Sequence, residues 1–185
     1  MSIIEENRRV TMICGDLDGV PEHPVPEGYT NRWYTPGDQT AWTKIQAGAD
    51  PFNSIGAGLF EREFGDDMQV LGRRQCFLCK DGHEGGEIGT ATAWCDKKRD
   101  GGRMGLVHWV AILPEFQGAG LSKPLMSTVC ARMRDLGHRR ARLVTSTGRI
   151  PAINLYLYFG FLPEMRSKED KENWRLIREH LKYPC

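Results

Sequence analysis

Residues 103–136 join a strand pattern to a helix pattern through a short loop with two glycines, and few folds accommodate this arrangement. The strand ends in an apolar run, and residues 117–122 read Gln-Gly-Ala-Gly-Leu-Ser. A turn of this kind collects free backbone N–H groups at the positive end of a helix dipole. Apolar residues then recur three and four positions apart at Leu125, Met126, Val129, Cys130, Met133 and Leu136. The stretch predicts an anion-binding loop between a strand and an amphipathic helix.

Gly118 and Gly120 are the residues of this loop that would allow an anion to approach its backbone. A residue without Cβ adopts unusual dihedral angles and lets a phosphate approach the main chain closely. The loop lacks the G-x-x-x-x-G-K-[ST] pattern of an ATP site and the G-x-G-x-x-G pattern of a dinucleotide site in a parallel βαβ unit. Two glycines could also serve only to permit a tight turn, so the loop alone leaves both interpretations open.

Three strand candidates lead up to the loop, at about residues 74–80, 87–94 and 103–112. Short connections rich in glycine separate them, which favours an antiparallel meander. The other predicted elements, in chain order, are a strand at 28–34, a helix capped by Asp38, a second helical stretch from Phe52 to Phe60, a strand at 141–145, a helix at 152–159, a strand from Phe161 and a terminal helix.

Local signals predict how two of these helices begin and end. Ser167 and Asp170 have the spacing of a capping box at the start of the terminal helix, whose Trp174, Ile177 and Leu181 then face inward. Gly137 suits the end of the helix that follows the glycine loop.

The chain length predicts a single core. Residues 1–27 are expected to be an irregular arm that ends in three prolines and lies on the domain. Residues 28–185 are expected to form one domain that includes the C-terminal helix.

The composition argues against several classes of partner. A formal net charge of +1 removes the electrostatic case for a general nucleic-acid binder. No stretch approaches the roughly 20 apolar residues of a membrane span, and the first residues lack the basic-then-apolar order of a signal peptide. We therefore expect a cytoplasmic protein without a nucleic-acid or membrane partner.

The six cysteines are scattered and do not show the dense spacing of a secreted disulfide framework. Cys76 and Cys79 form a C-x-x-C, followed by His83 and Cys95, so zinc binding or redox chemistry is an alternative. On a strand, an offset of three residues places two thiols on opposite faces. We therefore favour buried, apolar-like cysteines.

Two segments resemble motifs of the GNAT superfamily of N-acetyltransferases. Residues 110–120 resemble its cofactor motif, in which an apolar strand end and a Pro-Glu-aromatic turn precede Q/R-x-x-G-x-G/A. Residues 152–161 resemble its A-I-x-L-Y-x-x-x-G-F helix and strand, and the order of elements matches from about residue 28 to 165. Ser122 stands where the family usually has Gly or Ala, and Arg149 stands where many members have a cofactor-contacting asparagine.

The resemblance implies an α/β (α+β) fold, with a mixed, mostly antiparallel central sheet and helices on both faces. It implies an enzyme that transfers acetyl from acetyl-CoA to a primary amine of a small molecule, protein or peptide, without a metal ion, as a monomer or homodimer. The alternative is a non-catalytic acyl-CoA-binding or sensing module, which the departures at Ser122 and Arg149 motivate.

The implied cofactor-binding residues lie at the strand end, in the loop, in the first helical turn and in the second motif. In the family, two strands splay apart, which frees backbone groups near Val110 and Ile112 to bind pantetheine and polarise the acetyl carbonyl. The full set is Val110, Ala111, Ile112, Gln117, Gly118, Ala119, Gly120, Leu121, Ser122, Lys123 and Asn154.

Two side chains are candidates for proton transfer. Tyr156 matches the family tyrosine beside the cofactor sulfur, and a phenol with a pKa of about 10 can donate a proton to a departing thiolate. The alternative is a buried core tyrosine. His108 is a candidate base, acting directly or through water, because its reference pKa of about 6.5 suits deprotonation of an ammonium. A structural histidine is the alternative, and Glu87 and Glu115 are weaker base candidates.

Strand alternation predicts that Leu106, His108, Val110 and Ile112 share one face unless a bulge changes the phase. Trp94 and Trp109 could line an acceptor pocket or belong to the core. Basic residues near the cofactor helix could meet the adenosine 3′-phosphate or form a solvated face, namely Arg132, Arg134, Arg139, Arg140 and Arg142. The identity of the amine is left open.

Overall fold

The computed structural model describes residues 2–95 and 101–184. The chain divides into two compact units, which are described in turn. Unit 1 comprises Met1–Pro21, Cys95–Leu106 and Met133–Cys185, and unit 2 comprises Glu22–Trp94 and Val107–Arg132.

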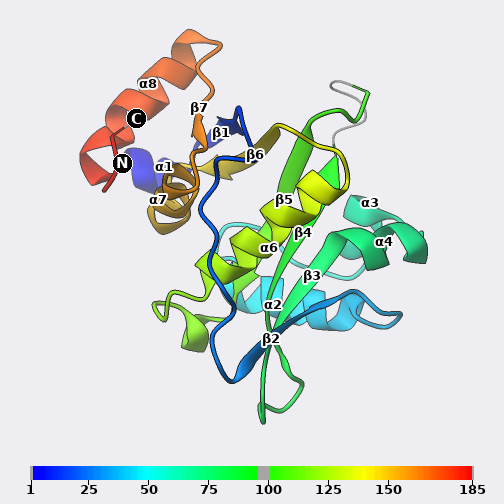
Figure 1. The fold of residues 1–185 in the computed structure, drawn as a ribbon. Helices are drawn as coiled ribbons and strands as arrows, with labels where there is room; N and C mark the ends of the chain where they lie inside the picture. Colours follow the sequence, from blue (N-terminus) through cyan, green and yellow to red (C-terminus); the bar gives the residue numbers. More distant parts are fainter. Residues whose placement is uncertain (1, 96–100, 185) are drawn as a thin grey trace. The chain divides into compact units, whose positions relative to one another are not determined.

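Unit 2 contains an antiparallel meander (Figure 1). β2 (Tyr29–Trp33) pairs with β3 (Gln75–Lys80), and β3 pairs with β4 (Glu87–Cys95), in both cases antiparallel. β5 (Gly105–Ile112) follows and leads to the glycine loop. These four strands agree with the predicted ones to within about two residues at each end, a margin typical of strand assignment.

The helices of unit 2 depart from the prediction in two places. α2 (Gln39–Ala49) forms as predicted. α3 (Leu59–Phe64) begins only after Gly58, whose φ of 74° lies in the left-handed region. The predicted helix over residues 52–58 is therefore wrong, because glycines there favour an irregular connection. α4 (Met68–Arg74) was not predicted.

Two aspartates behave differently at helix N-termini. Asp67 caps α4 by accepting two N–H bonds from the first turn. Asp38 makes no side-chain cap on α2. Its carboxylate instead binds Arg32 and the backbone N–H of Thr35. The predicted cap is wrong because a guanidinium competes successfully for the same oxygens.

Helices cover both faces of the sheet in unit 2. On one face, Phe77 of β3 shares an apolar core with Trp42 of α2. On the opposite face, α6 (Ser122–Asp135) lies over β2, where Asn31 Nδ2 donates to Thr128 Oγ1 at 2.6 Å. The two faces follow from strand alternation, because Arg32, next to Asn31, pairs in register with Phe77.

The helix after the glycine loop ends as predicted. Gly137 has a φ of 85°. Its N–H donates to the Arg134 carbonyl at 2.9 Å, and the His138 N–H donates to the Met133 carbonyl at 2.9 Å. These two bonds form a Schellman motif, which requires a left-handed residue that glycine supplies without strain.

Unit 1 continues with the elements predicted after the cofactor helix. They are β6 (Ala141–Ser146), α7 (Ile150–Tyr158), β7 (Leu162–Pro163) and α8 (Lys168–Ile177). A 3-10 turn that was not predicted, η2 (Arg178–His180), follows α8. The capping box of Ser167 and Asp170 at the start of α8 is confirmed. Trp174 and Ile177 are buried as predicted, whereas Leu181 lies beyond α8 and is only half-buried.

The irregular arm predicted for residues 1–27 is wrong in its first half. α1 (Ile3–Glu6) precedes β1 (Arg9–Cys14), which pairs antiparallel with β6 on one side and with β7 on the other. Figure 1 shows β1 running alongside β6 and β7. The N-terminal segment is thus an interior strand, held there by the burial of Val10, Met12 and Cys14.

Among the described residues, seven strands follow the order β2-β3-β4-β5-β6-β1-β7 in a single sheet. Together with the flanking helices, this order confirms the predicted α/β fold. No helix in the described ranges has the length and apolar character needed to traverse a bilayer.

Candidate active site

The glycine loop has the geometry that an anion site needs. Gly118 and Gly120 have φ values of 78° and 76°, which residues with a Cβ rarely adopt. A Cβ built at either position meets no atom within 4 Å. The main chain at both glycines is therefore open to a phosphate, which a side chain would obstruct.

The loop is anchored at both ends and leaves its N–H groups available. Gln117 Nε2 donates to the Ile112 carbonyl at 2.8 Å, and the buried Leu121 holds the other end. Ala119 lies exposed between the two glycines. Among the described residues, the backbone N–H groups from Gly118 to Leu121 donate to no protein acceptor. This donor set fits a diphosphate.

The first turn of α6 completes this region. Ser122 begins the helix, and Lys123 is half-buried, with its N–H donating to the Gly120 carbonyl at 3.1 Å. Pro124 occupies the third position, where a missing N–H is tolerated. The helix therefore directs its N-terminus at the loop, as the sequence predicted.

The strand that enters the loop is irregular. Trp109 has a φ of 50°, an unusual value for a residue with a Cβ. His108, Trp109 and Val110 are all half-buried, so the predicted alternation from Leu106 to Ile112 is broken. The reason is local: one residue in the left-handed region rotates the side chains that follow it out of phase.

The side chains at the end of β5 are largely withdrawn from the surface. Ala111 and Ile112 are buried, and the Ile112 carbonyl already accepts the Gln117 side chain. Binding of pantetheine and of the oxyanion by main-chain groups of this segment stays a prediction.

His108 lies against a carboxylate that the sequence analysis did not identify. Its Nε2 is 2.9 Å from Glu63 Oε2, and Trp109 Nε1 donates to the same oxygen at 2.9 Å. The hydrogen bond with His108 is the main cause that lowers the pKa of Glu63, with a smaller contribution from Trp109, although burial acts in the opposite direction. Glu63 is therefore a carboxylate at neutral pH.

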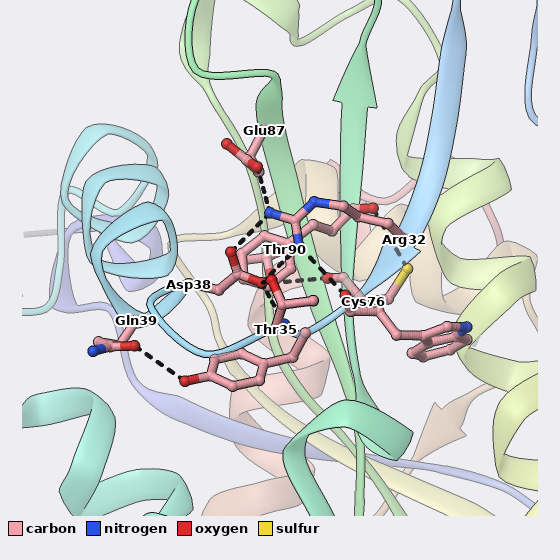
Figure 2. Close-up of polar contacts among 10 residues, drawn as sticks. Arg32, Thr35, Asp38, Gln39, Cys76, Glu87 and Thr90 are labelled. Carbon is pink, nitrogen blue, oxygen red and sulfur yellow. Dashed lines mark hydrogen bonds and ion pairs between the residues drawn. The ribbon is translucent and has the colours of Figure 1, made fainter. Parts of the chain in front are cut away.

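The two weaker base candidates are placed less favourably. Figure 2 shows Glu87 turned toward the guanidinium of Arg32, with which it forms an ion pair. Arg32 also binds both oxygens of Asp38, at 2.6 and 2.8 Å, and this hydrogen bonding is the main reason that the pKa of Arg32 is raised. Glu87 is thus occupied by a permanent cation, and Glu115 lies exposed in η1 (Pro114–Phe116).

Tyr156 belongs to unit 1 and is 7% exposed. Burial raises its pKa to about 12, and the nearby charge of Arg149 reduces this effect. The phenol is therefore protonated at neutral pH and keeps its O–H available as a hydrogen-bond donor. Its ring contacts Phe161, with the centroids 6.3 Å apart.

Two further residues of unit 1 have partners of their own. Asn154 Oδ1 accepts the backbone N–H of Lys182 at 2.7 Å, so its amide oxygen fastens the C-terminal segment. Arg149 Nη1 donates to Ser146 Oγ at 2.5 Å and precedes α7 without a side-chain cap. Cofactor binding by Asn154 stays a prediction.

The predicted arginine cluster is divided between different partners. Arg132 stacks over Trp33 at 4.0 Å, Arg134 donates to the Leu17 carbonyl, and Arg139 pairs with Asp18 at 2.7 Å. Arg142 is 8% exposed, and Arg140 is exposed. These contacts favour structural roles for most of the cluster.

Cys76 of the C-x-x-C is fully buried, and burial raises its pKa to about 12. Cys79 is half-buried, and burial raises its pKa as well. Within the described ranges, no group of three or more His, Cys, Asp or Glu side chains is arranged to hold a metal ion. Both thiols are therefore poor nucleophiles, as expected for apolar-like cysteines.

The tryptophans suggested for an acceptor pocket pack against the aromatic core of unit 2. Trp109 meets Trp42 edge-on with centroids 5.3 Å apart, and Trp94 meets Phe64 edge-on at 5.4 Å. Both remain half-buried. They thus combine a core contact with partial exposure.

Glu63 and Gln46 are the polar residues that sequence reasoning missed. Glu63 lies in a six-residue helix between Gly58 and Gly65, where no periodic pattern marks it. Gln46 is 2% exposed on α2, and its Nε2 donates to the Trp109 carbonyl at 2.9 Å. A polar residue next to Ile45 on the apolar stripe of a helix was the one available signal for Gln46.

Comparisons with known proteins agree with this geometry. The model of the acetyltransferase (GNAT) family matches residues 41–161. Mycothiol acetyltransferase of Streptomyces bingchenggensis is 31% identical over 145 residues, which are 77% of this chain and 46% of that protein. This chain spans about half the length of the curated mycothiol acetyltransferases that it matches.

Solved structures share the fold. A GCN5-related N-acetyltransferase from Sphaerobacter thermophilus superposes with a TM-score of 0.67 at 20% identity, over 85% of this chain and 49% of that one. The ribosomal-protein-S18-alanine N-acetyltransferase of Escherichia coli superposes with a TM-score of 0.60 at 19% identity, over 74% of this chain and 79% of that one.

Proposed function

Because this chain belongs to the acetyltransferase (GNAT) family, we propose that it transfers an acetyl group from acetyl-CoA to a primary amine. The observation that carries the proposal is the loop of Gly118 and Gly120. Both glycines have positive φ, open space at the Cβ position and N–H groups without a protein acceptor. These groups would hold the diphosphate of acetyl-CoA, and Ser122 is small enough to leave the site open.

The reaction requires few protein groups. The amine nitrogen, once neutral, attacks the thioester carbon, so that a C–N bond forms and the C–S bond breaks. The attacking nitrogen loses a proton to a base, the carbonyl oxygen becomes transiently anionic, and the departing thiolate gains a proton. Main-chain N–H groups at the end of β5 are our candidates for the oxyanion donor.

We assign the base role to His108 and the donor role to Tyr156. With a pKa of about 12, the phenol stays protonated and can hydrogen-bond the departing sulfur. Complete transfer of its proton to a thiolate with a pKa of about 8.5 would be uphill by roughly 4–5 kcal/mol. Tyr156 therefore acts chiefly by stabilising the developing thiolate, which then takes its proton from water. This is a narrower role than the general acid that the sequence suggested.

The acceptor is a primary amine of a small molecule, a protein or a peptide. The names of similar proteins span that range, from a mycothiol acetyltransferase to a ribosomal-protein-S18-alanine N-acetyltransferase. A cytoplasmic location and a monomeric or homodimeric state stay predictions.

Thiol release from acetyl-CoA in the presence of a panel of amines tests this function. Tyr156→Phe is expected to lower kcat by about 10- to 100-fold while the Kd for acetyl-CoA changes little. Tyr158→Phe is the matched control, because this half-buried tyrosine lies on the same helix. Equal losses of binding and turnover in Tyr156→Phe would contradict the assigned role.

The departures at Ser122 and Arg149 motivate one alternative, a non-catalytic acyl-CoA-binding or sensing module. Thermal stabilisation by CoA without thiol release across the whole amine panel would favour that alternative. Thiol release with any amine would exclude it.

A further inference from the structure

We propose that Glu63 is a positioning residue that fixes the ring of His108 for general-base catalysis. The inference rests on the proposed acetyl transfer and adds a second residue to its base. Neither the motifs of the sequence nor the resemblance to a family points to Glu63, which lies outside both motif segments. The contacts around the carboxylate of Glu63 point to this role.

One carboxylate oxygen of Glu63 is hydrogen-bonded to two neighbouring side chains of β5. Oε2 is 2.9 Å from His108 Nε2 and 2.9 Å from Trp109 Nε1. Two donors on one oxygen fix the carboxylate more tightly than either would alone. The His108 ring is thereby fixed relative to the strand and to α3.

This convergence is unusual for adjacent strand residues. Consecutive side chains of a regular strand point to opposite faces. His108 and Trp109 nevertheless reach the same oxygen, because Trp109 has a φ of 50°. A non-glycine residue in this region stores about 1–2 kcal/mol of strain and persists only where its surroundings impose it.

Two contacts impose the left-handed conformation on Trp109. The buried Gln46 donates from Nε2 to the Trp109 carbonyl at 2.9 Å, which holds the irregular peptide from the side of α2. The Trp109 ring is packed edge-on against Trp42, which is fully buried. Strain is thus maintained where His108 meets Glu63, as is typical of functional sites.

The carboxylate itself sits on a rigid support. Phe64, the next residue on α3, is 5% exposed and packs edge-on against both Trp42 and the His108 ring, with centroids 5.6 and 5.7 Å apart. The backbone of Glu63 is therefore tied to the aromatic core, while its side chain remains 31% exposed and that of His108 28% exposed. The pair is both ordered and reachable.

The charge of Glu63 decides which ring nitrogen is basic. A carboxylate only accepts hydrogen bonds, so Nε2 must carry the proton that points to Oε2. The lone pair of a neutral His108 ring then lies on Nδ1, which is the atom that removes the proton from the amine. After that transfer, the imidazolium keeps its bond to Glu63, and the negative charge stabilises it.

Proton NMR and steady-state kinetics together test this role, with Glu63→Gln and Glu61→Gln as a matched pair. Both glutamates lie on α3, and Glu61 is exposed. The wild-type chain should show a downfield, slowly exchanging imidazole N–H resonance that His108→Gln abolishes. Glu63→Gln should shift this resonance upfield and lower kcat by about 10- to 100-fold, with the KM for acetyl-CoA within about twofold. Glu61→Gln should change neither.

Trp109→Phe provides a second variant that keeps the His108 contact. It removes one of the two donors to Oε2, so the resonance should persist and kcat should fall less than in Glu63→Gln. A resonance that is unchanged in Glu63→Gln, or a kcat within twofold of wild type in that variant, would overturn the positioning role.

Failure of the proposed function gives a different pattern. A wild-type chain that releases no thiol with any amine would overturn acetyl transfer, and the positioning role with it. The N–H resonance would in that case still show the hydrogen bond between His108 and Glu63. A wild-type chain that releases thiol at the same rate as Glu63→Gln would overturn the positioning role alone.

Discussion

The buried amide of Gln46 donates a hydrogen bond to the main-chain carbonyl of Trp109 at 2.9 Å, which ties α2 to the irregular point of β5. This is the residue whose φ of 50° breaks the alternation of the strand. The bond satisfies a carbonyl that, in a regular sheet, would accept an N–H from a neighbouring strand. α2 therefore takes part in shaping the strand that leads to the glycine loop.

Gln46→Met should destabilise the chain and disturb this strand. Methionine fills a similar volume but leaves the Trp109 carbonyl unsatisfied, which costs about 1–3 kcal/mol of the free energy of unfolding. Urea denaturation measures this loss. Gln39→Met is the control, because Gln39 lies on the same helix but binds the Tyr34 hydroxyl. Equal stability losses in the two variants would show that the contact with Trp109 has no special weight.

The N-terminal strand should contribute to the core as fully as any predicted element. Met12 is fully buried and pairs in register with Leu143 of β6 and Pro163 of β7. Met12→Ala should therefore lower the free energy of unfolding by about 2–5 kcal/mol. Thr11→Ala, at the adjacent half-buried position, should cost less than about 1 kcal/mol. A loss below 1 kcal/mol for Met12→Ala would mean that β1 does not hold its place in the sheet.

The signal for β1 was present in the sequence and was overlooked. Val10, Met12 and Cys14 recur at every second position, which is the period of a half-buried strand, and Arg9 and Thr11 at the alternate positions are polar. The sequence pattern does not reveal which strands pair with β1, because its partners lie more than a hundred residues away in the chain. The three prolines that follow this segment favoured the prediction of an irregular arm.

The glycine loop and its helix were predictable because the signal is local. Gly118, Gly120 and Gly137 occupy positions where positive φ is required, and each was recognised from its neighbours. Glu63 and Gln46 were not predictable, since their roles arise from contacts with β5 across 45 and 63 positions of the chain. Asp38 is the converse case. Its position in the sequence is typical of a helix cap, but its carboxylate forms an ion pair with Arg32 instead.

Gly118→Ala should weaken acetyl-CoA binding beyond its effect on stability. An added Cβ meets open space in the free protein but is strained at a φ of 78°, at about 1 kcal/mol. The same methyl group would obstruct a phosphate approaching the loop. We expect the Kd for acetyl-CoA, measured by calorimetry, to rise about tenfold.

Gly82→Ala is the matched control for that measurement. Gly82 has a φ of 71° and equally open surroundings in the connection between β3 and β4. It should show the same loss of stability with an unchanged Kd. If both variants bound acetyl-CoA equally well, the loop would not be the diphosphate site.

Alkaline pH should destabilise the chain, and two buried acids with strongly raised pKa values contribute to this effect. The pKa of Tyr156 is raised from 10.0 to about 12 by burial, and that of Cys76 from 9.0 to about 12. In the unfolded chain these groups ionise at their ordinary values, so above pH 9 the unfolded state binds fewer protons than the folded state. The free energy of unfolding must then fall as pH rises toward 12, and it is unaffected by these groups below pH 9.

Tyr156→Phe isolates one of the two contributions. The rise of the Tyr156 pKa from 10.0 to about 12 corresponds to about 3 kcal/mol, most of which appears between pH 10 and 12. Urea denaturation from pH 8 to 11.5 should therefore give a shallower alkaline decline for Tyr156→Phe than for the wild type. Tyr183→Phe serves as the control because Tyr183 is 40% exposed. Parallel declines for wild type and Tyr156→Phe would mean that the phenol is not buried, and its proposed role as a fully protonated donor would lose its physical basis.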